Sequence, residues 1–190
     1  MGCFSYPLDA PPYPPENRDM DARLPKIFFL VLVIYAIANL TYDYPGLPNI
    51  VASHFTLNGT ANGWQTKQML YAAFGGVTVL AAGLVFAIPA LMGRTKSMNI
   101  PHREYWLAPE RLGETQQFIA AWFGWFGCAI FALIYFAFEF AVDTSLHPTN
   151  PPAASRLLYL LAAFGAFDVV WIIRLLTRFS RVPGDAAAQR

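Results

Sequence analysis

The residues best suited to chemistry or binding are concentrated in one polar stretch, residues 48–67. A histidine in such a stretch can accept a proton or bind a metal near neutral pH, and His54 is placed to do so. Two Asn-Gly pairs follow it, and glycine tolerates the positive φ of a tight turn. We therefore expect two turns that fold the stretch into a defined binding surface. Its candidate ligand- or partner-binding residues are His54, Asn58, Gly59, Gly63, Trp64 and Lys67.

Hydrolytic chemistry at a metal is one alternative for this stretch. His147, Asp43 and Asp143 would lie on the same side of the protein as His54. Their spacing matches no metal-binding pattern, however, and no nucleophile has a base at a recognisable spacing. We therefore assign no catalytic residue, no metal ligand and no cofactor. A metal-dependent membrane hydrolase is kept only as the last of three hypotheses.

Two acidic residues lie inside long apolar runs. Asp168 is more than one turn from either end of its run, whereas Glu139 is close to the end of its own. An aspartate near the middle of a bilayer costs about 2.5–3.5 kcal/mol on insertion scales, so it usually faces the interior of a bundle or a water-filled cavity. We expect Asp168 to bond a neighbouring helix or to take part in ion or ligand passage, and Glu139 to reach solvent.

A second motif lies between the second and third apolar runs. It contains Tyr105, Trp106, Glu110 and Arg111. Paired aromatic residues beside charges are typical of a helix that lies along a membrane surface. We expect such a helix here, with Tyr105 and Trp106 as its apolar tip. The alternative is a docking site for a cytoplasmic partner.

These motifs are positioned by an unusually apolar chain. Hydrophobic residues make up 56% of the 190 residues and charged residues only 13%, which is too little charge to cover a water-soluble domain of this size. Apolar runs long enough to cross a bilayer occur at about residues 24–41, 69–92, 117–142 and 156–176. The sequence therefore predicts an all-α integral membrane protein with four transmembrane helices.

The distribution of basic residues predicts its orientation. Arginine and lysine flank residues 24–41 on their N-terminal side, residues 93–115 and the C-terminal end, whereas the other two connections hold only Lys67 and Arg156. By the positive-inside rule both termini are cytoplasmic and residues 42–68 face outside. The ends of the chain are then a proline-rich tail, residues 1–23, and a short tail, residues 178–190. A net charge of +1 argues against nucleic acid as a partner.

The spaced motif Pro48, His54-Phe55, Asn58-Gly59, Gly63-Trp64, Lys67 resembles the bacterial domain of unknown function at the N-terminus of SdpI-type immunity proteins. Residues 99–111 resemble the cytoplasmic loop of the same group. The resemblance implies an SdpI-like membrane domain over residues 24–115, with an outer loop at 42–68 and a cytoplasmic loop at 93–115, followed by a second helical pair at 116–177. It also implies a multi-pass protein of the bacterial inner membrane.

The leading functional hypothesis is a non-enzymatic protein whose ordered outer loop binds a peptide, a lipid or a partner protein. In its immunity form the protein protects the cell from a membrane-active toxin. The second hypothesis is an accessory subunit of a larger membrane complex, which would contact its partner through the aromatic run at 117–142 and the proline-rich tail. Membrane lipid is an expected partner in either case, together with a protein partner or further copies of the chain.

Overall fold

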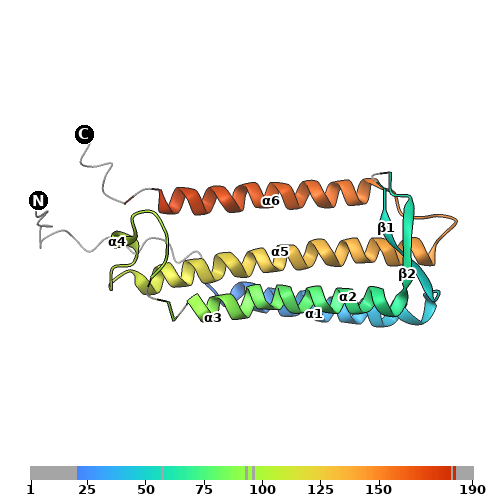
Figure 1. Ribbon diagram of the computed structural model, residues 1–190, viewed down its shortest axis with the longest axis horizontal. Helices are drawn as coiled ribbons and strands as arrows, with labels where there is room; N and C mark the ends of the chain where they lie inside the picture. The colour runs from blue at the N-terminus through green and yellow to red at the C-terminus, as the bar shows by residue number, and fades with distance from the viewer. Residues whose placement is uncertain (1–20, 57, 93, 96, 181, 183–190) are drawn as a thin grey trace, which may run out of the picture.

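The computed structural model describes residues 21–182, apart from residues 57, 93, 96 and 181. The predicted proline-rich tail falls almost entirely outside these residues, as does most of the C-terminal tail. Within the described part, four helical segments are long and apolar enough to cross a membrane: Leu24–Gly46, Lys67–Met92, Leu112–Leu146 and Ser155–Phe179. The prediction of four transmembrane helices is confirmed. Helix α1 starts and helix α6 ends at the same end of the bundle (Figure 1).

The first half of the chain is a helical pair joined by a β-hairpin. Helix α1 (Leu24–Asp43) continues into a 3-10 turn, η1 (Tyr44–Gly46), and the hairpin consists of strands β1 (Ile50–Phe55) and β2 (Ala61–Thr66). Helix α2 (Lys67–Ala82) follows β2 directly. The Thr66 hydroxyl accepts a hydrogen bond from Met69 N–H and caps the start of the helix. The hairpin lies across one end of the bundle, which we call the hairpin end (Figure 1).

The second transmembrane segment contains a wide turn. Helix α2 leads into a π-helix, η2 (Gly83–Ala87), and then into α3 (Ile88–Met92). Pro89 lies in this last segment and has no N–H with which to continue the regular hydrogen-bond ladder. A single π turn is a known way for a helix to absorb such an interruption. The irregularity therefore lies within the turn that precedes the proline.

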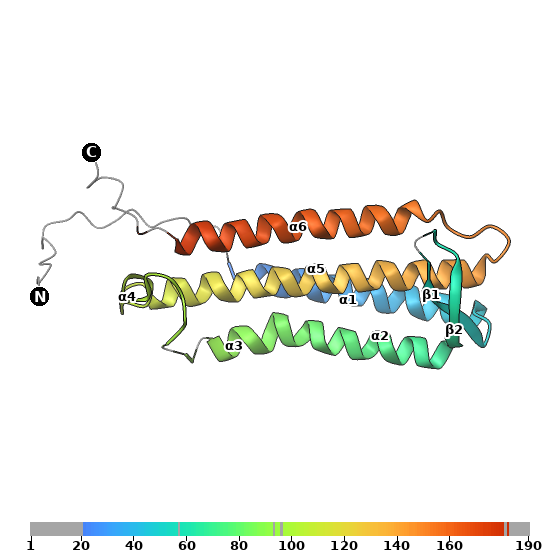
Figure 2. The same cartoon turned by 45° about the horizontal axis from the view of Figure 1, so that its top comes forward.

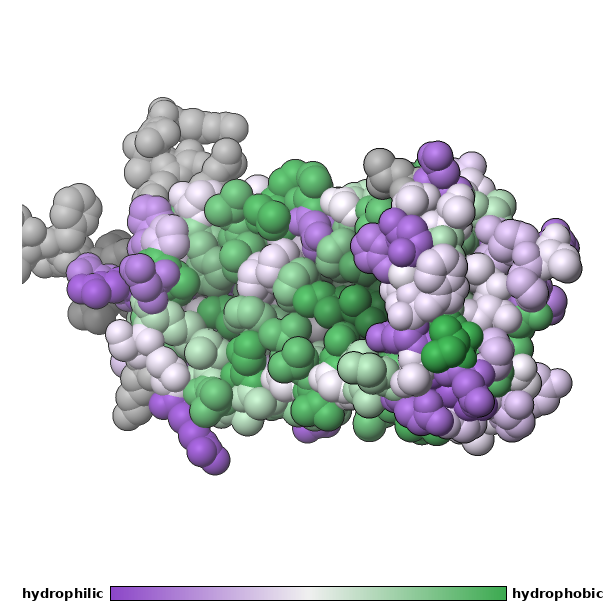
Figure 3. All heavy atoms as spheres, turned by 45° about the vertical axis from the view of Figure 1, so that its right-hand side comes forward, coloured by the Kyte–Doolittle hydropathy of each residue, from purple (hydrophilic) through white to green (hydrophobic). Residues whose placement is uncertain are grey.

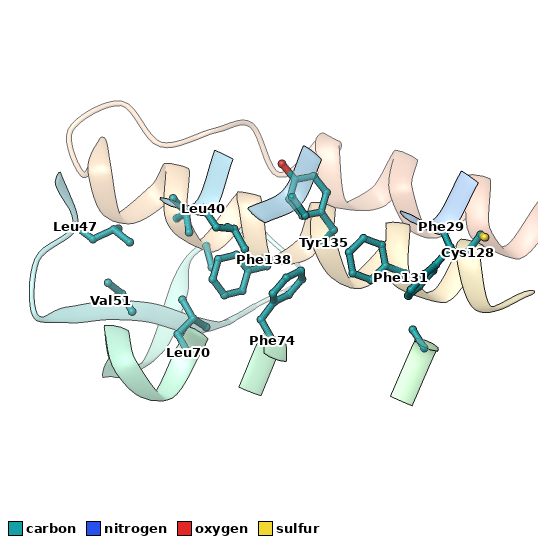
Figure 4. Close-up of a cluster of buried hydrophobic side chains, with 14 of the residues drawn as sticks. Phe29, Leu40, Leu47, Val51, Leu70, Phe74, Cys128, Phe131, Tyr135 and Phe138 are labelled. Atoms are coloured by element: carbon teal, nitrogen blue, oxygen red, sulfur yellow. The ribbon is translucent and has the colours of Figure 1, made fainter. Parts of the chain in front are cut away.

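The second half of the chain is an antiparallel pair of long helices, α5 (Leu112–Leu146) and α6 (Ser155–Phe179). Helix α5 is central, with α1, α2 and α6 arranged around it (Figure 2). Close approach to α1 is possible because Gly124 and Cys128 present small surfaces, and the Cys128 thiol donates to the Pro25 carbonyl over 3.2 Å. The main core lies between α1, α2 and α5, and its rings at Phe74, Phe131 and Phe138 pack together (Figure 4).

The aromatic run is therefore directed mostly inward. Trp122, Phe131, Tyr135, Phe138 and Phe140 are all buried within the described chain. Most of these rings belong to the protein's own core, whereas Phe136 is 53% exposed. That the run contacts a partner protein stays a prediction. The apolar surfaces left exposed belong mainly to α1 and α6. They form a band between two more polar ends, as expected for a protein surrounded by lipid (Figure 3).

The other end carries the short helix α4 (Arg103–Trp106), so we call it the α4 end (Figure 1). Trp106 is only 3% exposed and packs edge-on against Phe179, with their ring centroids 5.4 Å apart. Trp106 is therefore not available as the apolar tip that was expected, because its ring packs in a buried cluster with Ile119 of α5 and Phe179 of α6. The Arg111 guanidinium lies over the Tyr105 ring, and Glu110 is exposed.

Candidate functional site

The hairpin is fastened to the end of α1 by Lys67. Its ammonium group donates to the carbonyls of Tyr44 and Leu47 over 3.3 and 3.1 Å, and it lies 4.5 Å from the centroid of the Tyr44 ring. Carbonyls at the C-terminal end of a helix lack hydrogen-bond partners within the helix and carry partial negative charge. An ammonium group supplies both the missing hydrogen-bond donors and a compensating positive charge. Lys67 is therefore a structural clamp that joins the start of α2 to the end of α1.

The strands contain the other residues of the predicted loop motif. His54 and Asn62 lie side by side, and the His54 ring Nδ1 is hydrogen-bonded to the Asn62 side-chain oxygen. A Cβ atom on Gly63 would lie 2.9 Å from the Cβ of His54, so the strands approach closely at this irregular position. The second predicted turn, at residues 62–63, is wrong: these residues are part of β2. Trp64 is 60% exposed.

The remaining Asn-Gly pair forms the hairpin turn, as predicted. Gly59 has a φ of +74°, and its N–H donates to the Thr56 carbonyl over 2.9 Å. A Cβ atom on Gly59 would lie 2.6 Å from the Cβ of Ala154, at the start of α6. On the other side of the hairpin, Ala52 N–H donates to the Ser145 hydroxyl of α5 over 3.0 Å. The hairpin thus braces the connection between α5 and α6.

A cavity of about 680 Å³ lies near the hairpin end among α1, α5 and α6. We call it the α1/α5/α6 cavity. Its acidic and basic lining residues are Asp43 from α1, Glu139 and Asp143 from α5, His147 directly after α5, and Arg156 from α6. Tyr35, Tyr135, Phe136 and Tyr159 supply aromatic surface. Its volume lies within the range of about 300–1,000 Å³ that is usual for small-molecule sites.

A single face of α5 supplies most of the polar groups. Tyr135, Glu139, Asp143 and His147 recur at intervals of four residues, which places them along one side of the helix. Asp143 is compensated within this cluster. Its Oδ1 lies 2.9 Å from His147 Nδ1, and its Oδ2 accepts a hydrogen bond from Arg156 over 3.0 Å.

Glu139 and Asp43 are differently placed. The Asn39 amide donates to the Tyr135 hydroxyl over 2.9 Å, and Tyr135 lies one helical turn before Glu139 on α5. The Oε1 atom of Glu139 is buried and has no hydrogen-bond partner in the described part of the chain. Asp43 makes no ion pair among the described residues. Among the described residues the cavity therefore holds two carboxyl groups without a compensating cation, and Glu139, which was expected to reach solvent, has one carboxyl oxygen buried.

The predicted binding residues and the cavity are thus different parts of one structure. His54, Asn58, Gly59, Gly63, Trp64 and Lys67 build the hairpin, and none of them lines the cavity. The sequence reasoning missed Asn39, Tyr135 and Arg156. The four-residue spacing along residues 135–147 was a readable signal for the polar face of α5, although a helix of this length was not expected.

Two further hypotheses about polar groups can be compared with the structure. Among the described residues, no three His, Cys, Asp or Glu side chains are arranged to hold a metal ion, so the geometry gives the hydrolase hypothesis no support.

Asp168 lies on α6, three residues from Trp171, and its Oδ1 is buried without a hydrogen-bond partner in the described part. The expected bond from Asp168 to a neighbouring helix is therefore not made within this part of the chain.

A second hollow, of about 590 Å³, lies between α1 and α2. Its lining is almost wholly apolar, with Ala36, Leu40, Phe74 and Gly75 among its residues and no charged side chain. Such a surface suits the hydrocarbon tail of a lipid and offers nothing to orient a polar ligand. The α1/α5/α6 cavity is consequently the better candidate for a specific site.

Comparison with known proteins identifies one matching family. A domain of unknown function (DUF1648) matches residues 27–79, from α1 through the hairpin to α2. This domain occurs in SdpI-like membrane proteins. No curated protein and no solved structure matches the chain. The match contains all the hairpin motif residues, whereas the two helices that supply most of the cavity wall, α5 and α6, lie beyond it.

Proposed function

We propose that this multi-pass membrane protein is a non-enzymatic, SdpI-like binding protein that takes up its ligand in the α1/α5/α6 cavity. The observation that carries the proposal is the cavity itself, which combines polar groups on one face of α5 with aromatic surface near the hairpin end. A cavity of this kind, with a few polar groups among apolar walls, is the usual form of a ligand site.

The hairpin supports this role by holding the mouth of the cavity in place. Lys67 fixes the hairpin to α1, Ala52 fixes it to α5, and Gly59 contacts Ala154 at the start of α6. Three helices that line the cavity are therefore tied together at one end. The matched family domain supplies the hairpin, and the second helical pair supplies most of the site.

We further propose that the hairpin end faces outside in a bacterial inner membrane. Basic residues are concentrated at the α4 end, where they are Arg23, Lys26, Arg94, Arg103, Arg111, Arg174 and Arg178. The hairpin end has only Lys67 and Arg156 in the described part of the chain. Because basic flanks are retained in the cytoplasm, this asymmetry supports cytoplasmic termini and a cavity that opens to the outer side.

The test is to purify the protein in mild detergent and identify the molecules that stay bound. Leu160 lines the cavity, whereas its neighbour Leu161 is 56% exposed and lies outside it. Leu160→Trp fills the cavity, and Leu161→Trp is the matched control. We expect a co-purifying molecule in the native chain and in Leu161→Trp, and its loss in Leu160→Trp. Equal amounts in all three proteins, or none in any, would contradict the proposal.

The immunity hypothesis makes a separate prediction in cells. Deletion of the gene should increase sensitivity to at least one membrane-active peptide, and the Leu160→Trp variant should fail to restore protection. Unchanged sensitivity across a panel of such peptides would contradict the immunity hypothesis. The binding proposal would be unaffected, because the purification experiment tests it independently.

An accessory role in a larger complex is the second candidate function. Helix α6 favours it, since none of its most apolar window is buried inside the protein. A partner helix could cover this surface as readily as lipid does. A stoichiometric protein partner that is retained on purification and lost when α6 residues such as Val170 and Ile173 are replaced would favour this role.

A further inference from the structure

We infer that the ligand of the α1/α5/α6 cavity carries an ammonium group on an apolar body. This inference rests on the proposed function and names the chemical class of the ligand. It follows from the two carboxyl groups that have no cationic partner among the described residues, the aromatic residues beside them and the apolar side chains that complete the cavity wall.

The charge balance of the wall indicates a cation. Asp143 is already paired with His147 and Arg156, so these three groups need no further partner. Glu139 and Asp43 have no cationic partner among the described residues. A carboxylate in surroundings of low dielectric is stabilised by an opposite charge far more than it would be in water. A cationic ligand would supply that charge.

The buried oxygen of Glu139 indicates where the cation would be held. Tyr135 lies one turn before Glu139 on α5, and the Oε1 atom of the Glu139 carboxyl is buried and has no described partner. Glu139 lies seven residues before the end of α5, or about 10 Å along the helix at 1.5 Å per residue. The cation would therefore enter the membrane-embedded part of the cavity and would not remain at its mouth, where Asp43 lies.

The aromatic residues select the type of cation. Tyr35 and Tyr135 pack edge-to-face with centroids 5.8 Å apart, and Phe136 and Tyr159 also line the cavity. Aromatic faces attract alkylated ammonium groups, and cages of several rings are a known way to bind them. A small hydrated metal ion would gain little from these rings, and no described group of three ligands exists for one.

The apolar body of the ligand has a place in the same cavity. Leu157 and Leu160 of α6 line it, and 53% of Phe136 is exposed next to them. The α6 wall of the cavity thus offers apolar surface at Leu157 and Leu160 beside its charged residue, Arg156. An alkyl or aromatic body could lie there while its ammonium group reaches Glu139. The volume of about 680 Å³ fits one such small amphiphile.

The experiment uses photoreactive alkyl probes on the full chain in uncharged maltoside micelles, with adducts located by mass spectrometry. One probe has a trimethylammonium head, and its matched control has a hydroxyl head on the same chain. We expect the ammonium probe to label α1 and α6 residues around the cavity at a concentration about tenfold lower than the hydroxyl probe, from the strength of cation–aromatic and charge attraction. This comparison needs no variant.

Two single variants and their double variant assign the effect to the two carboxyl groups. Asp43→Asn and Glu139→Gln should each raise the half-labelling concentration of the ammonium probe, and together should bring it to that of the hydroxyl probe. Glu104→Gln, at the α4 end, is the control and should change nothing. Unfolding midpoints measured in the same micelles show whether each variant is folded. Leu160→Trp should abolish labelling of the cavity by either probe.

The experiment distinguishes failure of the ammonium inference from failure of the proposed binding function. If both probes label the cavity equally and Leu160→Trp blocks both, the ammonium inference is overturned while the binding function stands. If neither probe labels the cavity, both are overturned. Added phosphatidylethanolamine that displaces the ammonium probe identifies a lipid head group as the natural source of the ammonium. If it does not displace the probe, a free amphiphile is the source, and the recognition of ammonium is supported in both cases.

Discussion

Trp122 and Trp171 form a reciprocal pair that joins the two longest described helices. Their rings are stacked with centroids 3.4 Å apart and an interplanar angle of 9°, and each indole N–H donates to the backbone carbonyl of the other residue, over 3.2 and 3.1 Å. The α6 helix has few buried residues of its own, so this pair accounts for much of its attachment to α5. The position of α6 in turn sets one wall of the α1/α5/α6 cavity.

Replacing Trp171 with Phe should therefore loosen α6. The variant removes one indole donor and part of the stacked surface, and we expect it to lower the free energy of unfolding by about 1–3 kcal/mol. The measurement is denaturant unfolding in detergent micelles. Trp64→Phe is the matched control, because Trp64 is 60% exposed at the hairpin end and should change stability little. Equal effects of the two substitutions would show that the indole pair does not hold α6.

Lys67→Met should destabilise the connection between α1 and α2. It removes hydrogen bonds from a charged donor to the carbonyls of Tyr44 and Leu47, and we expect a loss of about 1.5–3 kcal/mol in the free energy of unfolding. Limited proteolysis should also cut the hairpin more readily. Lys26→Met is the control, since no hydrogen bond of the Lys26 side chain is described. If proteolysis of the hairpin is unchanged, Lys67 is not the clamp.

The sequence was sufficient for the helices because their signals are local. Apolar runs separated by charged or proline-rich segments are visible in the sequence alone, and the run predicted to begin near residue 69 lies in the segment that starts with α2 at Lys67. The hairpin was harder. Asn58-Gly59 forms the expected turn, but the identical pair at residues 62–63 is extended, because pairing with β1 outweighs its preference for a turn.

The cavity could not be predicted, since it depends on how α6 and α1 lie around α5. Trp106 illustrates the same limit: an aromatic residue beside charges is typical of a membrane surface, yet contact with Phe179 buries it. Only the tertiary arrangement decides between these outcomes. The polar stripe from Tyr135 to His147 was visible in the sequence, but its partners Asn39 and Arg156 come from other helices.

Gly59→Ala should strain the hairpin turn. Its φ of +74° disfavours any L side chain, at a cost of about 1–2 kcal/mol, and the new methyl group would also meet Ala154 at 2.6 Å. The double variant with Ala154→Gly should recover part of the loss by removing the contact while leaving the φ strain. Gly165→Ala, in α6 with nothing within 4 Å, is the control and should be neutral or slightly stabilising. An unfolding midpoint for Gly59→Ala equal to that of the native chain would contradict the close contact.

Accessibility of single cysteines should show the orientation of the protein. In a chain with Cys3→Ser and Cys128→Ala, a membrane-impermeant thiol reagent should label Asn58→Cys in intact cells. Glu104→Cys, in α4, should be labelled only after the membrane is permeabilised. The expectation follows from the basic residues at the α4 end. Labelling of Glu104→Cys from outside, with Asn58→Cys protected, would reverse the orientation and place the cavity on the cytoplasmic side.

Asp168 provides a test of whether another chain covers α6. Its Oδ1 is buried and has no hydrogen-bond partner among the described residues, and an unpaired polar group in such a place costs about 1–3 kcal/mol. If the protein acts alone, Asp168→Leu should raise the free energy of unfolding by removing that cost, and Asp168→Asn should have a smaller effect. A donor from a second copy or a partner subunit would reverse the result, because the substitution would then break a bond within the membrane. Unfolding in micelles, combined with the mass of the purified species by light scattering, distinguishes a chain that acts alone from one whose Asp168 bonds another chain. Stabilisation of a monomer supports a chain that acts alone, whereas destabilisation together with loss of a larger species assigns Asp168 to an interface and favours the accessory-subunit function.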